Sequence, residues 1–255
     1  MRKIVIAILV MFLGISGYAQ KWKLTRYEAI VGIGTTNFFG DIGGFPNGQN
    51  WYGLKDINIF RTRPSLYFGA RYKLQQDKAI KFNLIFAWMN EKDNPSVNYQ
   101  DTRKYTSNSF ALEQSLQFEY SFVKEDRHRF SFALFNRRGM LNNYSKIGFY
   151  GFAGLGGLLY IPGFKGQIQP TVETVKTSVG YTMVFPIGLG IKLIYNNKYA
   201  FGFEFGGRYI LSDYVDGIST KFSHHNDVYY FGVFNLVYRI KTSIRGYPMI
   251  FKSYY

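Results

Sequence analysis

Large aromatic residues alternate strictly with small or charged residues along much of this chain. In the stretch AFGFEFGGRY, Phe201, Phe203 and Phe205 alternate with Gly202 and Glu204. Successive side chains of a β-strand point to opposite faces, so this period of two is the pattern of a strand. The same pattern predicts eight strands, at residues 28–37, 64–74, 79–89, 109–123, 147–160, 178–194, 199–210 and 228–241.

The predicted strands have the length and composition of membrane-spanning strands. A tilted transmembrane β-strand needs roughly 9–11 residues, and each segment reaches that length. The chain holds 22 Tyr and 25 Phe, while only 18% of its residues are charged. Strands that face lipid have this composition. We therefore predict an all-β fold, an eight-stranded antiparallel transmembrane β-barrel in contact with outer-membrane lipid.

The volume of the barrel decides which face of each strand is inside. The interior of an eight-stranded barrel is only just wide enough to be filled by side chains. We therefore expect the small and charged residues inside and the aromatic residues against lipid. Buried charges need partners, and the inward acids and bases are balanced. The predicted lumen charge pairs come from Arg71, Lys192, Arg208, Glu113, Glu119 and Glu204.

Two segments are less well defined by the pattern. The fifth predicted strand, residues 147–160, is so rich in glycine that the sequence does not fix which of its faces is inside. In the sixth, Pro186 cannot donate a hydrogen bond to a neighbouring strand. We expect a bulge or a weak point at Pro186.

The first nineteen residues have the features of a secretory signal peptide. Arg2 and Lys3 precede an apolar run, and small residues around Ala19 fit a cleavage site. A membrane anchor is the alternative, but the apolar run is shorter than a spanning helix requires. Residues 20–255 then form one barrel domain. Because the chain has no cysteine, it offers neither a lipid attachment site nor thiolate metal ligands.

The connections between the predicted strands differ in length. Turns near residues 75–78 and 196–197 are short, whereas segments 38–63, 90–108, 161–177 and 211–227 are long. Short periplasmic turns and long external loops are typical of outer-membrane barrels. Two further periplasmic segments are predicted, a long basic insert at 124–146 and a C-terminal tail at 242–255.

The formal net charge of +15 falls mainly on the predicted periplasmic segments. A strongly basic surface favours an acidic partner, which could be lipid headgroups, nucleic acid or protein. Export argues against nucleic acid, and contact with lipid phosphates is the simpler alternative. Apolar residues in the insert favour a protein partner. The predicted contact residues are Arg127, Arg129, Phe130, Arg137, Arg138, Lys146, Arg245 and Lys252.

Candidate chemistry is confined to the last external loop. A hydrolase or acyltransferase set would use Ser223, His224, His225 and Asp227, and a metal site would use both histidines with Asp213 and Asp216. Adjacent histidines on an extended segment point to opposite sides, which disfavours one shared site. The ligand spacing matches no established metal set. We therefore predict no catalytic residue, cofactor or metal.

Three stretches, residues 35–44, 63–74 and 203–220, resemble the PorG-like outer-membrane barrels of the type IX secretion system of Bacteroidetes. The residues that carry the resemblance are Gly40, Asp41, Arg208, Tyr209, Asp213, Tyr214 and Asp216. The resemblance implies a non-enzymatic barrel that anchors a periplasmic ring containing a lipoprotein, with a role in protein secretion and gliding motility. The alternative is a small barrel that acts as a passive solute pore or as a structural membrane protein.

Overall fold

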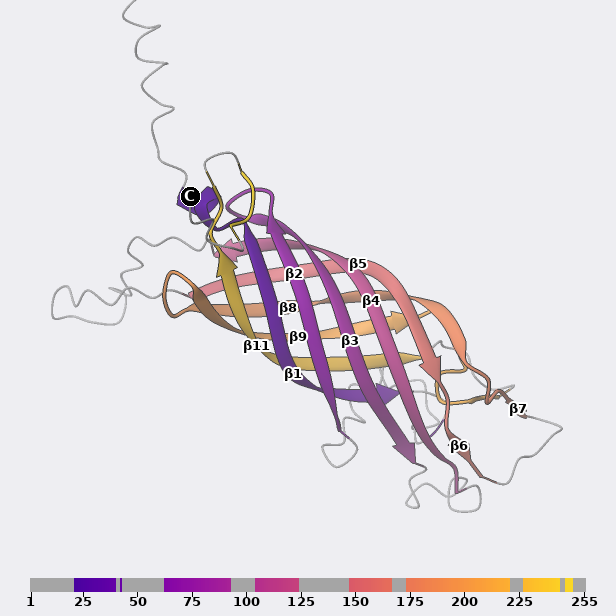
Figure 1. Ribbon diagram of the computed structural model, residues 1–255. Helices are drawn as coiled ribbons and strands as arrows, with labels where there is room; N and C mark the ends of the chain where they lie inside the picture. Colours follow the sequence, from indigo (N-terminus) through magenta and orange to yellow (C-terminus); the bar gives the residue numbers. More distant parts are fainter. Residues whose placement is uncertain are drawn as a thin grey trace, which may run out of the picture.

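The protein forms a closed antiparallel barrel. The computed structural model describes residues 21–39, 42, 62–92, 104–123, 147–166, 173–220, 227–243 and 246–249. Within these residues eight strands pair in chain order, and the last strand pairs with the first (Figure 1). The barrel strands are β1 (Tyr27–Phe39), β2 (Arg63–Lys73), β3 (Lys78–Lys92), β4 (Thr106–Val123), β5 (Ile147–Ile161), β8 (Gly180–Ile194), β9 (Tyr199–Ile210) and β11 (Val228–Ile240). The predicted eight-stranded barrel is confirmed.

Shorter elements flank the barrel. A 3-10 helix, η2 (Lys21–Thr25), precedes β1. At the other end β6 (Phe164–Lys165) pairs with β4, and β7 (Glu173–Val175) pairs with β10 (Ile218–Thr220). Among the residues that the structure describes, no helix is long and apolar enough to cross a membrane.

The two ends of the barrel differ in their connections. Tyr27 pairs with Ile240, so β1 begins and β11 ends at the same end of the barrel, at the upper left of Figure 1. The short turns at 74–77 and 195–198 lie at this end. Because β6, β7 and β10 lie in the longer connections of the opposite end, the arrangement fits short periplasmic turns and long external loops. We name the two ends accordingly.

The outer surface of the barrel is apolar. Ile33 and Phe234 are each 69% exposed, and Leu189 is 66% exposed. Every second residue along the strands is instead buried in the lumen, as the alternating burial of β4 and β11 illustrates. A closed ring of strands with an apolar exterior satisfies its backbone hydrogen bonds internally, so it is suited to the outer membrane.

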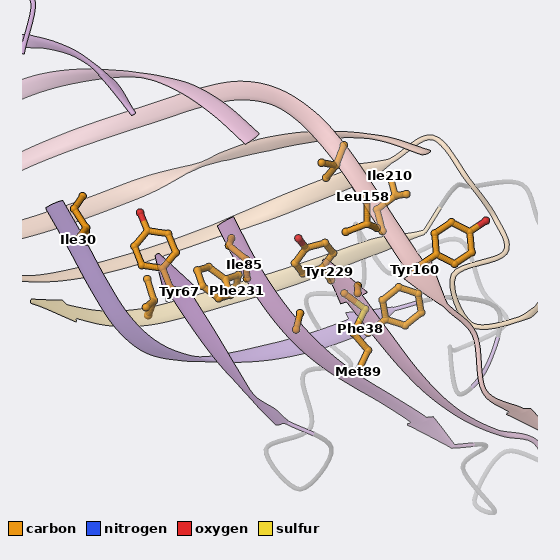
Figure 2. Close-up of a cluster of buried hydrophobic side chains, with 14 of the residues drawn as sticks. Ile30, Phe38, Tyr67, Ile85, Met89, Leu158, Tyr160, Ile210, Tyr229 and Phe231 are labelled. Carbon is orange, nitrogen blue, oxygen red and sulfur yellow. The ribbon is translucent and has the colours of Figure 1, made fainter. Parts of the chain in front are cut away.

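The lumen holds more bulky side chains than the sequence predicted. Tyr67, Tyr229 and Phe231 are at most 1% exposed and lie inside the barrel together with Met89 (Figure 2). The expectation that small and charged residues would fill the interior while the aromatic residues face lipid was therefore wrong in part. Most of the charged side chains occupy the periplasmic part of the lumen, whereas Tyr229, Met89 and the pair of Arg208 and Glu113 lie toward its external end.

Glycines on β8 make room for two of the bulky lumen residues and fix the faces of β5. A Cβ atom at Gly190 would lie 2.3 Å from Cζ of Tyr150, and one at Gly188 would lie 2.6 Å from Cζ of Phe152. Tyr150 and Phe152 are both buried. The face of β5 that the sequence left open is thus set by aromatic rings that pack over glycine backbone.

Pro186 interrupts one ladder without a bulge. The register between β8 and β9 continues unchanged through Pro186 and Arg208. Toward β5, pairing is missing only between Ala153↔Ile187 and Gly156↔Val184, with the register the same on both sides. The prediction of a weak point holds for this side of the strand, whereas the register shift recorded in the barrel lies elsewhere, between Ser121 and Val123 of β4.

Candidate functional site

Glu28 on β1 is the centre of a cationic cluster at the periplasmic end of the lumen. Its carboxylate lies 2.9 Å from Nη1 of Arg71, 2.7 Å from Nζ of Lys192 and 2.9 Å from Nζ of Lys73. Nε of Arg239 lies 3.5 Å away. Glu28 itself is 2% exposed. One buried carboxylate thus contacts bases from three other strands.

Arg71 and Lys81 connect this cluster to two further carboxylates. Nε of Arg71 lies 2.6 Å from Oε2 of Glu119, and its Nη2 lies 3.5 Å from Oε1 of Glu204. Nζ of Lys81 lies 2.8 Å from both Glu119 and Glu204. The hydroxyl of Tyr150 donates a hydrogen bond of 2.8 Å to Glu204. The carboxylates of Glu119 and Glu204 are therefore each contacted by at least two donor side chains, as buried charges require.

We call this set the lumen charge network. Its members come from all eight barrel strands: Glu28 (β1), Arg71 and Lys73 (β2), Lys81 (β3), Glu119 (β4), Tyr150 (β5), Lys192 (β8), Glu204 (β9) and Arg239 (β11). Because every strand contributes, the network cross-links the barrel internally. Its space is filled, and at its periplasmic mouth a pit of about 20 Å³ remains beside Arg71, Lys73 and Lys192.

A second buried pair lies closer to the external end. Nε of Arg208 lies 3.5 Å from Oε2 of Glu113, and the guanidinium carbon lies 4.4 Å from the ring centroid of Phe231. The hydroxyl groups of Tyr229 and Ser115 donate hydrogen bonds to the Glu113 carboxylate. Glu113 is thereby held by one cation and two hydroxyl groups.

The structure places all six lumen charges named from the sequence inside the barrel. Arg71, Glu119, Lys192 and Glu204 belong to the lumen charge network, and Arg208 lies beside Glu113. Among the described residues, five further inward-facing charges of the strands were not predicted, and these are Glu28, Lys73, Lys81, Glu91 and Arg239. All five lie at or near the ends of the predicted strands, so we had counted them with the segments outside the barrel. Each of them is an even number of positions away from another inward-facing residue of its strand, so the alternation could have identified them. Consequently the basic surplus of the periplasmic face is smaller than predicted.

The chain beyond β11 folds back onto the segment that precedes β1. The backbone N–H of Thr242 donates to Leu24 O at 2.9 Å, and the Thr242 hydroxyl accepts from the N–H of Arg26 at 3.2 Å. The hydroxyl of Tyr27 donates to Gly246 O at 3.3 Å. Within the described part of the tail, Thr242 and Pro248 form an antiparallel bridge. These contacts hold both ends of the described chain together at the periplasmic mouth.

This region has an exposed apolar and basic surface. Leu24 is 55% exposed, Tyr247 is 69% exposed and Met249 is 53% exposed. The guanidinium of Arg26 lies 4.9 Å from the ring centroid of Trp22. We call this surface the terminal platform, and define it as Trp22, Lys23, Leu24, Arg26, Lys241, Tyr247 and Met249.

The partner-contact residues named from the sequence lie outside the described residues. These are Arg127, Arg129, Phe130, Arg137, Arg138, Lys146, Arg245 and Lys252. The same holds for the predicted signal peptide at 1–19 and the predicted insert at 124–146. Of the predicted tail, the structure describes residues 242–243 and 246–249.

The described residues 211–218, which follow β9, pack over the external end of the lumen. Val215 is fully buried there, its N–H donates to Oδ2 of Asp227 at 3.0 Å, and its carbonyl accepts from Ser109 Oγ at 2.7 Å. Oδ1 of Asp216 accepts from the N–H of Ile218 at 3.1 Å. Burial, reinforced by the nearby Asp216 carboxylate, raises the pKa of Asp227 well above its usual range.

The residues that carry the family resemblance lie mainly in this region. Arg208 is in the lumen, Tyr209 faces outward, and Tyr214 packs against the apolar core. Asp213 is half-buried and Asp216 is buried. Gly40 and Asp41 lie outside the described residues. The motif of the seventh predicted strand thus builds the cap of the barrel.

The alternative catalytic and metal sets are described only in part. Ser223, His224 and His225 lie outside the described residues. Asp227 accepts a backbone hydrogen bond, as described above. In the part of the chain that the structure describes, no group of three His, Cys, Asp or Glu side chains could hold a metal ion.

No protein-family profile matches the chain, and no curated protein matches it. Solved structures to which it is similar are the N-terminal barrel of Pseudomonas aeruginosa OprF (11% identity, TM-score 0.42), Yersinia pestis Ail (10%, 0.43) and Neisserial surface protein A (8%, 0.41). The alignments cover 84% of this chain and 97%, 98% and 97% of those chains. At these TM-scores the similarity adds nothing to the strand pairing described above.

Proposed function

We propose that this protein is a non-enzymatic outer-membrane component of the type IX protein secretion machinery. In this proposal it anchors a periplasmic ring that contains a lipoprotein. The barrel fixes the protein in the membrane, and its periplasmic end binds the ring through basic and aromatic residues.

The terminal platform is the observation that carries the proposal. Closing the barrel requires only the pairing of β1 with β11, which ends at Tyr27 and Ile240. The chain nevertheless continues in a fixed arrangement on both sides of this pair and exposes Leu24, Tyr247 and Met249. Aromatic and Arg side chains are the preferred anchors of protein interfaces. An arrangement of this kind at the periplasmic mouth favours a protein partner over lipid alone.

A passive solute pore is the second candidate, and the lumen argues against it. Arg208, Tyr67, Tyr229 and Lys81 are each under 2% exposed, so these side chains pack against others rather than line a water-filled channel. A purely structural membrane barrel would need neither the terminal platform nor a basic insert.

Purification of the intact protein from detergent-solubilised membranes tests the proposal. The wild-type chain should retain a periplasmic lipoprotein, whereas Arg137→Glu combined with Arg138→Glu should release it and reduce secretion. Lys165→Glu, a charge reversal at an exposed residue of the external end, is the matched control and should retain the lipoprotein. If no lipoprotein accompanies the wild-type protein, the proposal is wrong.

A further inference from the structure

The barrel wall has a seam near its external end, between β2 and β3. The pairing of these two strands ends at Ser65↔Ala87. β2 nevertheless continues beside β1 to Arg63, and β3 continues beside β4 to Lys92. The residue that would pair next is Pro64, which has no N–H to donate. The two strands therefore separate where the ladder loses a donor.

A cavity of about 380 Å³ lies at this seam. This volume is within the range of small-molecule pockets, roughly 300–1,000 Å³. The cavity is lined by Arg63, Pro64, Trp88, Met89, Asn108, Ser109 and Phe110. Its residues come from the ends of three adjacent strands, so the seam itself creates the space.

The cavity opens toward the outside of the barrel and is closed on the lumen side. Trp88 is 43% exposed, and its ring packs edge-on against Phe110 at a centroid distance of 5.5 Å. Met89 and Ser109 are instead buried. The hydroxyl of Thr36 donates a hydrogen bond to Trp88 O, and this contact joins β1 to β3 behind the separated end of β2. A ligand would therefore enter from the surface that faces lipid.

The lining defines the chemical class of the ligand. Trp88, Met89, Phe110 and Pro64 offer apolar surface, and Arg63 places an exposed cation at the edge. We propose that this cavity binds the acyl chain of an anionic amphiphile from the external leaflet, with the chain between β2 and β3 and the headgroup at Arg63. The site lies at the opposite end of the barrel from the terminal platform, so it is independent of the function proposed above.

Photo-crosslinking of the full chain in bilayer nanodiscs tests this site. The probe is palmitate with a diazirine at the end of its chain, compared with palmityl alcohol and with phosphatidylglycerol that carry the same group. We expect the palmitate probe or the phosphatidylglycerol probe to label Met89 or Ser109. The probe that labels more efficiently identifies whether the acyl chain comes from a free fatty acid or from a phospholipid. Arg63→Gln should reduce labelling by the anionic probes about two- to fivefold, as for the loss of an exposed ion pair.

A variant that fills the cavity distinguishes binding at this site from non-specific labelling by surrounding lipid. Asn108→Trp adds a ring at the exposed rim and should abolish labelling of Met89 and Ser109. Phe234→Trp, on the outward face of β11, is the matched control and should leave this labelling unchanged. The heat-dependent gel shift of each variant verifies that the barrel is folded. Labelling that is spread over the outward faces of β8, β9 and β11 and is insensitive to Asn108→Trp would overturn the proposal.

Discussion

Arg71 and Glu119 form an ion pair inside the barrel, with Nε and Oε2 2.6 Å apart and both side chains at most 5% exposed. They lie on β2 and β4, which are separated by β3 in the wall. Arg71 also contacts Glu28 and Glu204. One guanidinium thus joins four strands across the lumen.

Removal of Arg71 should destabilise the barrel strongly. Arg71→Met leaves Glu28, Glu119 and Glu204 with fewer compensating charges, and breaking a buried pair in this way costs about 3–5 kcal/mol. Urea unfolding of the protein in detergent, followed by the heat-dependent gel shift, measures the change. Lys23→Met removes an exposed cation and should cost little. Equal stability of the two variants would contradict the cross-linking role of Arg71.

The pair of Arg208 and Glu113 should show strong coupling in a double-mutant cycle. Arg208→Met alone leaves a buried carboxylate without its cation, whereas Arg208→Met with Glu113→Gln removes both charges and keeps an acceptor for Tyr229. We therefore expect the single variant to be less stable than the double variant. Additive effects in the unfolding free energy would show that the two side chains do not interact.

The packed lumen should conduct poorly. Fully buried side chains such as Tyr67, Lys81 and Phe231 fill the space that an open channel would need. Planar-bilayer recordings of the purified protein should show no stable, large single-channel steps. Such steps, if they persist in separately purified samples, would contradict the side-chain packing of the lumen.

The alternation of residues predicted the strands because their outward faces must be apolar in a membrane. It also located Arg71 and Glu204 correctly inside. It could not predict that Tyr150 and Phe152 would fit there, since the space comes from Gly188 and Gly190 on another strand. The inward position of aromatic rings depends on the register between strands, which alternation alone does not specify.

The ends of the barrel were harder to predict. The terminal platform depends on contacts between Leu24 and Thr242, which are far apart in the sequence and show no pattern. The seam beside Pro64 depends on which residue of β3 lies opposite it. Neither feature carries a periodic signal, so both required the three-dimensional arrangement.

The external cap should be less stable at high pH because of Asp227. Burial and Asp216 raise the pKa of Asp227, with further contributions from Asp213 and Glu91, while the N–H of Val215 acts in the opposite direction. Because the pKa of Asp227 is higher in the folded than in the unfolded protein, this carboxyl contributes its full stability below its unfolded-state pKa of about 4. The contribution is lost as the pH rises through its folded-state pKa.

The variant Asp227→Asn tests this dependence, because it removes the charge and keeps an acceptor for Val215. It should stabilise the protein at about pH 8 and have little effect at about pH 3, where the wild-type carboxyl is protonated. Urea unfolding at both pH values provides the comparison. A variant that is less stable than wild type at about pH 8 would show that the ionised carboxylate is favourable here.

If the periplasmic end of the barrel binds a protein partner, substitutions in the terminal platform should weaken that binding. The measurement is the amount of periplasmic lipoprotein that co-purifies with the full chain carrying Tyr247→Ala and Met249→Ala. Leu211→Ala, at a residue of the external end that is 49% exposed, is the control. We expect a loss of about tenfold in affinity for the platform variant, equivalent to about 1.4 kcal/mol, and none for the control. Equal retention by the platform variant, the control and the wild-type protein would show that the terminal platform does not bind the partner.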